Sequence, residues 1–359
     1  MAQSQGPEPQ AVLGLPTRAA VFLVLAVEPG GHPAVRELLT ELDGLVRSVG
    51  FRHPDGRLSC VAGIGSAAWD GLYGGPRPAE LHPFAELRGP RHLAPATPGD
   101  VILHIRAERM DLCFELATLC TRRLAGSARV VDETHGFTYF DQRDLLGFVD
   151  GTENPGGRRA ALAAHVGAED GPFSGGSYLI VQKYLHDLGS WDTLNTEQQE
   201  RVIGRTKLSD VELGEQAADS HVAVNQVQGA DGEEQQILRA NMPFGTVGRG
   251  EYGTYFAGYC RTPAVTEEML RRMFLGTPEA AHDRILDFST AVTGSLFFVP
   301  SADFLADPPP APETPAPEQR PRPTVTPADV ARVHRTANGS LGIGGLKPDH
   351  HRPARVRAT

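Results

Sequence analysis

The sequence predicts an α+β protein built from two similar halves, in each of which antiparallel strands alternate with helices. Short apolar runs of the kind that form buried strands recur along the chain, and stretches with helical periodicity lie between them. Both patterns stop after Phe304, where the composition becomes rich in proline. The chain of 359 residues, 40% of them hydrophobic and 22% charged, is long enough to form a sizeable core.

The first half is expected at residues 18–145, after a polar arm at residues 1–17 that we expect to be flexible. Apolar runs predict its strands at residues 18–28, 58–65, 101–108 and 127–134. Stretches with one apolar face predict its helices at residues 33–49 and 109–125. A proline- and glycine-rich loop is expected at about 71–99. The resulting order, β-α-β-β-α-β, is that of a ferredoxin-like unit.

The second half is expected at residues 146–305 and contains similar pieces. Apolar runs predict its strands at residues 177–186, 253–262 and 295–300. One helix is expected to begin at Thr196 and another at Thr266, since threonine is a common N-terminal cap. We therefore predict tandem ferredoxin-like halves with antiparallel sheets.

The chain beyond these halves is expected to be a linker and a tail. Residues 306–336 begin with a dense run of prolines, which cannot form a helix or a sheet ladder and which favours a semi-rigid linker. Residues 337–359 are too few to form a core of their own. We expect the folded part to end near residue 305.

Composition argues against several classes of protein. The net charge of −10 disfavours nonspecific binding to nucleic acid, whose phosphates attract an excess of Lys and Arg. The four cysteines form no CxxC pair, which favours reduced, buried thiols. The N-terminus has no basic segment, and the first apolar run, at 19–27, is too short to span a bilayer. We expect a cytoplasmic protein with no membrane anchor.

The most informative local segment is a turn-rich loop, GFVDGTENP, at residues 147–155. Two glycines and a proline shape its backbone around Asp150. By residue type alone, this pattern is also typical of an ordinary Asp-Gly turn. His221 and Arg239 have ordinary interpretations too, as one of 13 histidines and as a surface ion-pair partner.

The loop resembles the GxxDG signature of the dye-decolourising peroxidases. Three further segments resemble parts of that family in the same order: DSHVAVNQ (219–226), ILRANMPFG (237–245) and ILDFSTAVTG (285–294). The resemblance extends from about residue 11 to 304 and is greatest to the B-type members. It implies a dimeric α+β barrel like that of the family and of chlorite dismutase, and one haem b per chain.

The resemblance also implies roles for individual residues. His221 would be the axial ligand of the haem iron, and Asp287 would hydrogen-bond its imidazole, which fixes the tautomer and raises the basicity of the ligand. On the other face of the haem, Asp150 would move a proton between the two oxygens of hydrogen peroxide. Arg239 would stabilise the negative charge that develops as the O–O bond breaks. Asn241 either orients peroxide or belongs to a turn.

The implied activity is that of a peroxidase that oxidises phenolic, dye-like or metal-ion donors with hydrogen peroxide. The alternative is a haem-carrying or iron-handling protein of the same fold with incidental peroxidase activity. Two further residues keep two interpretations each. Arg205 either contacts a haem propionate or is a solvated cation at a helix end. Phe256 either lines the distal pocket or is simply part of the core.

The tail contains the stretch GSLGIGGLKP, at residues 339–348. Leu341 and Ile343 alternate, so an extended chain presents both on one face, and Leu346 follows a flexible Gly-Gly pair. Composition favours a disordered tail with chance hydrophobic residues. The stretch nevertheless resembles the cargo-loading peptide by which dye-decolourising peroxidases enter encapsulin shells. That resemblance implies an encapsulin shell protein as partner and a place inside the nanocompartment. The resemblance of the folded part to the family implies a homo-oligomer of two to six chains.

Overall fold

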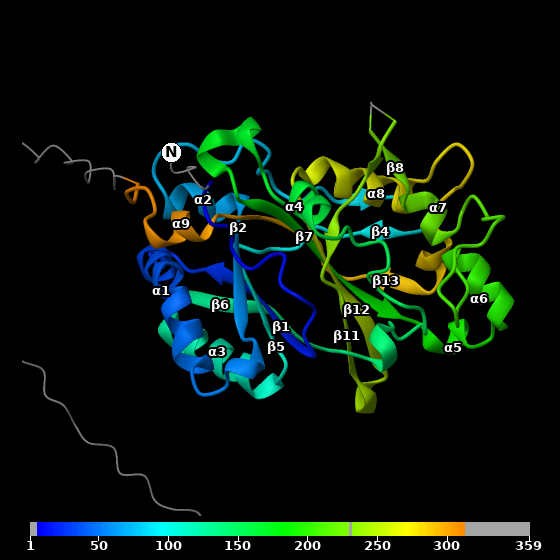
Figure 1. Ribbon diagram of the computed structural model, residues 1–359, viewed down its shortest axis with the longest axis horizontal. Helices are drawn as coiled ribbons and strands as arrows, with labels where there is room; N and C mark the ends of the chain where they lie inside the picture. Colours follow the sequence, from blue (N-terminus) through cyan, green and yellow to red (C-terminus); the bar gives the residue numbers. More distant parts are fainter. Residues whose placement is uncertain (1–5, 230–231, 313–359) are drawn as a thin grey trace, which may run out of the picture. The chain divides into compact units, whose positions relative to one another are not determined.

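An antiparallel sheet runs through both halves of the chain (Figure 1). The computed structural model describes residues 6–229 and 232–312. Most of the expected linker and the whole tail at 337–359, with Leu341, Ile343 and Leu346, therefore lie outside the described residues. The boundary between the linker and the tail at residue 337 therefore stays a prediction.

The first half has the strand arrangement that the sequence predicts. Its strands are β1 (Ala19–Val27), β2 (Ser59–Gly65), β5 (Val101–Ala107) and β6 (Ala128–Phe137), and its long helices are α1 (His32–Gly50) and α3 (Met110–Arg123). The strands lie in the order β2-β5-β1-β6, and all neighbours are antiparallel. Along β1, Val21 and Leu23 join the core shared with α1 and α3, whereas Phe22 and Val24 join a second core on the opposite face.

The second half repeats this order. Its strands are β7 (Ser177–His186), β10 (Leu238–Arg239), β11 (Met242–Thr246), β12 (Glu251–Cys260), β13 (Ser289–Ala291) and β14 (Ser295–Val299), and its long helix is α8 (Pro263–Leu275). The strands β14-β7-β12-β10 occupy the same relative places as β6-β1-β5-β2 in the first half. The predicted tandem ferredoxin-like fold is therefore confirmed.

The two halves join into one sheet through β14 and β2. Phe297 pairs with Gly65 and Phe298 pairs with Ile64, in antiparallel register. At the other ends of the sheet, β6 contacts β11, and a Cβ at Gly136 would lie only 2.5 Å from the Cβ of Met242. The sheet thus curls back toward itself, as expected of an α+β barrel.

Shorter elements connect the strands. These elements are α2 (Ser66–Leu72), β3 (Leu87–Arg88), β4 (Leu93–Ala94), α4 (Arg158–Ala164), α5 (Leu188–Trp191), α6 (Thr196–Ile203), α7 (His221–Asn225), β8 (Val227–Gln228), β9 (Glu234–Gln235), α9 (Ala302–Ala306) and the 3-10 helices η1 (Pro54–Gly56), η2 (Phe140–Gln142), η3 (Ala168–Phe173), η4 (Val247–Arg249) and η5 (Arg284–Asp287). The β3–β4 hairpin falls within the segment expected to be a loop. No helix within the described ranges is long and apolar enough to cross a membrane.

Two expected helix caps are wrong by a few residues. The cap of α6 is Asn195 rather than Thr196, because Asn195 and Gln198 form a reciprocal capping box. Helix α8 begins at Pro263 with Thr262 as its cap, since proline fits the first turn of a helix. Thr266 consequently lies inside the helix and is buried.

The described part of the N-terminal arm is packed rather than loose. The side-chain amide of Gln10 donates to the carbonyl oxygens of Ala62 and Pro300, at 2.9 Å each, and accepts from the amide of Ala62 at 2.8 Å. Val12 is buried in the core beside the sheet. These contacts differ from the flexible arm that composition suggested, because one glutamine satisfies backbone groups next to the β2–β14 junction.

Candidate functional site

A cavity of about 420 Å³ lies in the second half. Strands β7 and β12, helices α7 and α8 and the loop around Asp150 supply its walls. The cavity brings together six of the seven pocket residues predicted from the sequence: Asp150, Arg205, His221, Arg239, Asn241 and Phe256. Asp287 does not line it.

His221 opens the short helix α7, whose cap is Ser220. Its Nδ1 lies 2.7 Å from Oδ2 of Asp283, and the Asp283 carboxyl is completely buried. Asn225 donates to the same carboxylate oxygen at 3.3 Å and to the His221 carbonyl at 2.8 Å. Burial alone would lower the pKa of His221, but the charge and hydrogen bond of Asp283 outweigh it and raise the pKa. The imidazole is thus held by one nitrogen.

The expected partner of His221, Asp287, is wrong. Asp283 precedes η5 and caps it through Oδ1, which accepts from the Ile285 amide at 3.0 Å. This turn directs the remaining oxygen of Asp283 to His221, while Asp287, at the far end of η5, meets His92 and His282 instead. The segment ILDFSTAVTG (285–294) begins two residues after this carboxylate and does not contain it.

Asp150 and Asn241 are tied to each other in the cavity wall. The Asn241 side chain donates to Asp150 Oδ1 at 3.1 Å and accepts from the Ala257 amide of β12 at 3.1 Å. Burial raises the pKa of Asp150, although the Asn241 hydrogen bond and the Arg239 charge act in the opposite direction. Asn241 is therefore a partner of the carboxylate rather than only a turn residue.

Arg239 is positioned through its backbone by a residue that sequence reasoning missed. The Asn154 side chain accepts from the Arg239 amide and donates to the Arg239 carbonyl, at 2.8 Å each. Burial lowers the pKa of the Arg239 guanidinium. Asn154 belongs to the GFVDGTENP segment, so its motif was noticed but its role was not. The contact fixes the Asp150 loop against the strand that carries Arg239.

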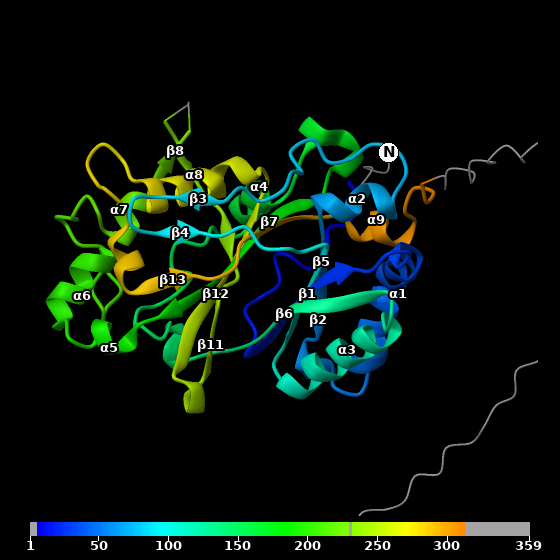
Figure 2. The same ribbon diagram turned by 180° about the vertical axis from the view of Figure 1, so that it is seen from behind.

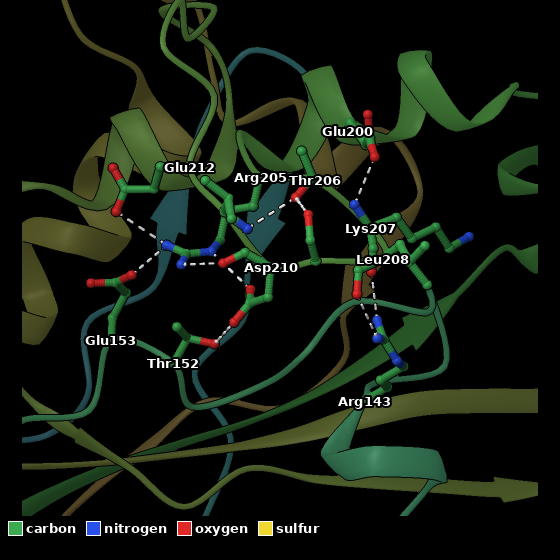
Figure 3. A network of polar contacts seen from close by, with 12 residues as sticks. Arg143, Thr152, Glu153, Glu200, Arg205, Thr206, Lys207, Leu208, Asp210 and Glu212 are labelled. Atoms are coloured by element: carbon green, nitrogen blue, oxygen red, sulfur yellow. Dashed lines mark hydrogen bonds and ion pairs between the residues drawn. The ribbon is translucent and has the colours of Figure 1, made fainter.

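Arg205 is enclosed by acidic groups (Figure 3). Its guanidinium forms ion pairs with Glu153, with Asp210 at 2.9 Å and with Glu212 at 3.1 Å. Its side chain is only 12% accessible, so the interpretation as a solvated helix-end cation is wrong. Thr152 donates to Asp210 at 2.6 Å, which links this cluster to the loop that carries Asp150.

Two other residues shape the cavity. Phe256 lines it and also packs against the core, so it is not a core residue only. His186 was missed from the sequence: its ring bonds to Ser289 at 2.8 Å and to Thr254 at 3.0 Å. Burial lowers the pKa of His186 to about 4, so the ring is neutral at physiological pH. The sequence signal for His186 is its position in β7, which places its side chain on the same face of the strand as Tyr184.

The arrangement is suited to binding a metal-containing group. Nε2 of His221 has no hydrogen-bond partner among the residues that the structure describes, and 36% of the side chain is accessible. An imidazole that gives one nitrogen to a carboxylate and leaves the other free is typical of a metal ligand. Asp150 and Arg239 add a proton acceptor and a fixed cation in the same cavity.

Comparison with known proteins gives consistent matches along the chain. Residues 9–138 match the family model described as "Dyp-type peroxidase, N-terminal", and residues 141–304 match "Dyp-type peroxidase, C-terminal". The dye-decolorizing peroxidase of Mycolicibacterium paratuberculosis is 58% identical over 344 residues, which is 95% of this chain and 93% of that protein.

Solved structures give similar results. The encapsulated DyP-type peroxidase from Mycobacterium smegmatis is 58% identical, with a TM-score of 0.84 over 86% of this chain and 100% of that one. DyPB from Rhodococcus jostii RHA1 is 56% identical, with a TM-score of 0.82 over 84% of this chain and 99% of that one.

Proposed function

The chain belongs to the Dyp-type peroxidase family and is a haem peroxidase, and we propose that His221 holds the haem iron while Asp150 and Arg239 act on hydrogen peroxide. Variants of the Rhodococcus jostii relative, 56% identical, have been solved in complex with haem. The observation that carries the assignment is the meeting of a carboxylate-bound imidazole, a carboxylate and a guanidinium in one cavity.

The residues around the cavity fit haem b, one per chain. His221 offers Nε2, and Asp283 holds the other nitrogen so that the ring keeps one orientation. Ile237, Met269 and Leu270 supply apolar surface for a flat macrocycle. When bound, haem supplies an iron centre that gives electrons to peroxide and recovers them from the donor.

The other residues act on protons and charge. The Asp150 carboxylate accepts a proton from one oxygen of peroxide and returns it to the other, while Asn241 holds its Oδ1 in place. Arg239 stabilises the negative charge on the departing oxygen, and Asn154 fixes the strand from which Arg239 projects. Asn241 thus positions the carboxylate that moves the proton.

Arg205 and Phe256 are proposed to contact the haem periphery. Glu153 and Glu212, which pair with Arg205, are 42% and 45% accessible, so either ion pair is weak enough to be exchanged for a haem propionate. Phe256 offers an aromatic face in the cavity wall. The donors proposed for the enzyme are phenolic, dye-like or metal ions.

The distal roles are tested by rapid mixing of haem-loaded protein with hydrogen peroxide. Arg239→Leu should slow the first spectral change of the haem by about 10²–10³-fold, as expected for loss of a fixed donor. Haem content measured beforehand must equal that of wild type. A rate equal to that of wild type would refute the role of Arg239. If the wild-type protein passed its haem or iron to an acceptor faster than it oxidised any donor, the haem-carrying alternative would apply.

We further propose that the protein works in the cytoplasm as a homo-oligomer of two to six chains, packed inside an encapsulin shell by its tail. The relative from Mycobacterium smegmatis was solved as an encapsulated enzyme. Leu341, Ile343 and Leu346 form a short apolar motif after a proline-rich linker. Such a motif binds an apolar groove in extended form, and several tails on one oligomer add avidity.

Packing is tested by co-expression with the encapsulin of the same host. Full-length protein should co-purify inside the shells, whereas a chain that ends at Ala337 should not. The double variant Leu341→Asp/Ile343→Asp should behave like the truncated chain, because two charges would lose water in an apolar groove. All forms should keep their peroxidase activity in solution. Equal loading of full-length and truncated chains would refute the docking role.

A further inference from the structure

A second polar cluster lies outside the cavity, around Asp287. His92 comes from the turn between β3 and β4, whereas His282 and Asp287 lie on either side of Asp283. None of these three cluster residues lines the cavity. Figure 2 shows the β3–β4 hairpin beside α8 and β13, and contacts between these elements bring His92 to the η5 segment.

The two imidazoles converge on one carboxylate oxygen. Nε2 of His92 and Nε2 of His282 each lie 3.1 Å from Oδ1 of Asp287, and their ring centres are 4.7 Å apart. One nitrogen from each ring and the carboxylate oxygen all lie within 4.8 Å of one another. Two ligands held about 2.0–2.1 Å from one tetrahedral zinc ion are about 3.3 Å apart. The cluster is therefore near the spacing of a coordination shell.

The two histidines of the cluster are partly buried, whereas Asp287 is an exposed residue. The side chains of His92, His282 and Asp287 are 19%, 13% and 27% accessible, so the atoms are held in place yet still reached by solvent. By comparison, His135 pairs with Glu133 at 2.7 Å but both side chains are well exposed, at 39% and 48%, and no second histidine joins them among the described residues. The Asp287 cluster is thus unlike an ordinary surface His–carboxylate pair.

We propose that His92, His282 and Asp287 form a binding site for a divalent transition-metal ion of the zinc class. Two imidazole nitrogens and one carboxylate oxygen are a ligand set that zinc accepts, and water would complete the shell. The ion would link the β3–β4 turn to the segment that carries Asp283, the residue that holds His221. Arg91, which lies 3.7 Å from Asp287 and is 66% exposed, is the cation that the metal would displace.

The test is zinc binding by full-length, haem-loaded protein after treatment with a chelator. The background carries His350→Ala and His351→Ala, since these tail residues could bind zinc themselves. Zinc titrated by calorimetry and counted by mass spectrometry should bind at one ion per chain. Loss of an outer-shell partner lowers metal affinity by about 10–100-fold. His92→Ala removes a proposed direct ligand, so it should weaken zinc binding by more than that. Asp287→Asn should do the same.

Matched variants make the outcome decisive. His135→Ala removes an exposed histidine with a carboxylate partner and should leave zinc binding unchanged. Arg91→Gln removes the competing cation and should strengthen zinc binding. Zinc should also raise the melting temperature of the background protein but not that of the His92→Ala variant. Equal zinc stoichiometry and affinity in the background and in His92→Ala would overturn the proposal, as would failure of the background protein to bind zinc.

Discussion

Two aspartates four positions apart have different partners at η5. Asp283 is completely buried and holds His221, whereas Asp287 is partly accessible and lies between two histidines. Their residue type and their sequence neighbourhood are alike, and only the turn between them separates the roles. The identity of the His221 partner is thus a property of backbone geometry.

The first prediction concerns Asp283. Asp283→Asn removes the negative charge beside Nδ1 of His221, so the imidazole becomes a less basic ligand. We expect haem affinity or peroxidase activity to fall by about 10–100-fold, and the iron to be reduced more easily. A redox titration and a haem-binding titration measure these effects. Glu133→Gln, which alters an exposed His–carboxylate pair elsewhere, is the control and should change neither.

The second prediction concerns the pH dependence of the reaction with peroxide. Burial raises the pKa of Asp150. Its carboxylate therefore becomes protonated at a higher pH than that of an aspartate in water, whose pKa is about 3.9. The rate should fall as the pH drops through this raised pKa, because only the ionised form accepts a proton. In Asp150→Asn the rate should be lower and this acid limb should vanish. An unchanged acid limb in the variant would assign the titration to another group.

At the residue scale, the sequence predicted which residues belong to the site better than it predicted which residues they contact. His221, Asp150 and Arg239 stand in segments that resemble a known family, so their neighbourhood could be predicted. Asn154 and His186 could not, because their roles depend on hydrogen bonds to residues far away in the chain. The acidic partners of Arg205 were missed for the same reason.

At the scale of elements, the cavity depends on the close pairing of β7 and β12. Thr254 of β12 lies opposite Tyr184 of β7, and both line the cavity. Gly253, which precedes Thr254, is packed so tightly that a Cβ there would lie 2.0 Å from the Tyr184 carbonyl oxygen and 2.6 Å from Phe244 Cζ. Glycine at this position permits the approach of the two strands.

The third prediction follows from that approach. Gly253→Ala should destabilise the protein by about 1–3 kcal/mol or more, which is the usual cost of overpacking. The new methyl group would overlap a backbone atom, which cannot move aside as a flexible side chain can. Urea denaturation of the haem-loaded protein measures the loss. The control is Gly44→Ala in α1, where the new methyl group meets open space and should stabilise the helix by about 0.5–1 kcal/mol. Equal stability of the two variants would contradict the steric argument.

Elements with strong periodicity could be predicted to within a few residues, and weak ones could not. Strand β7 was located at its observed bounds because ten consecutive residues have a strand-like composition. The β3–β4 hairpin was missed because its strands are two residues long and lie in proline-rich sequence. The observed helix starts differ from the predicted ones because a neighbouring residue forms the capping hydrogen bond instead, as Asn195 does in place of Thr196.

At the scale of the whole described unit, the cavity is built almost wholly by the second half, since Asp144 is the one residue of its lining that precedes residue 146. The internal duplication was predictable because each half repeats the same element order. The joining of the halves through β14 and β2 was not predictable. It depends on two residue pairs whose members are 232 or more positions apart in the sequence. Long-range pairings of that kind leave no local pattern.

The fourth prediction concerns the global stability of the molecule against pH. Burial raises the pKa of Asp144 to about 7, well above its value of about 3.9 in an unfolded chain. The folded state therefore binds more protons between these values, and stability falls as the pH rises from about 4 to 7. Asp144→Asn should remove this loss and stabilise the protein by about 1–3 kcal/mol at pH 8.

Melting curves of the Asp144→Asn variant and of the wild type, recorded at pH 5 and at pH 8, measure this effect. The difference between the two proteins should be small at pH 5 and larger at pH 8. The asparagine side chain keeps an oxygen that can accept from the Phe148 amide, as Asp144 does at 2.9 Å. A difference that is the same at both pH values would show that Asp144 does not titrate in this range.

The curled sheet has a consequence for how many copies of this chain can share a small volume. An open sheet ends in strands with unpaired amides and carbonyls, and such edges recruit strands from other molecules. Here β6 turns toward β11, so the two ends of the sheet face each other instead of the surroundings. We therefore expect contacts between copies to depend on helices, loops and side chains, and crowded molecules not to grow into a shared sheet.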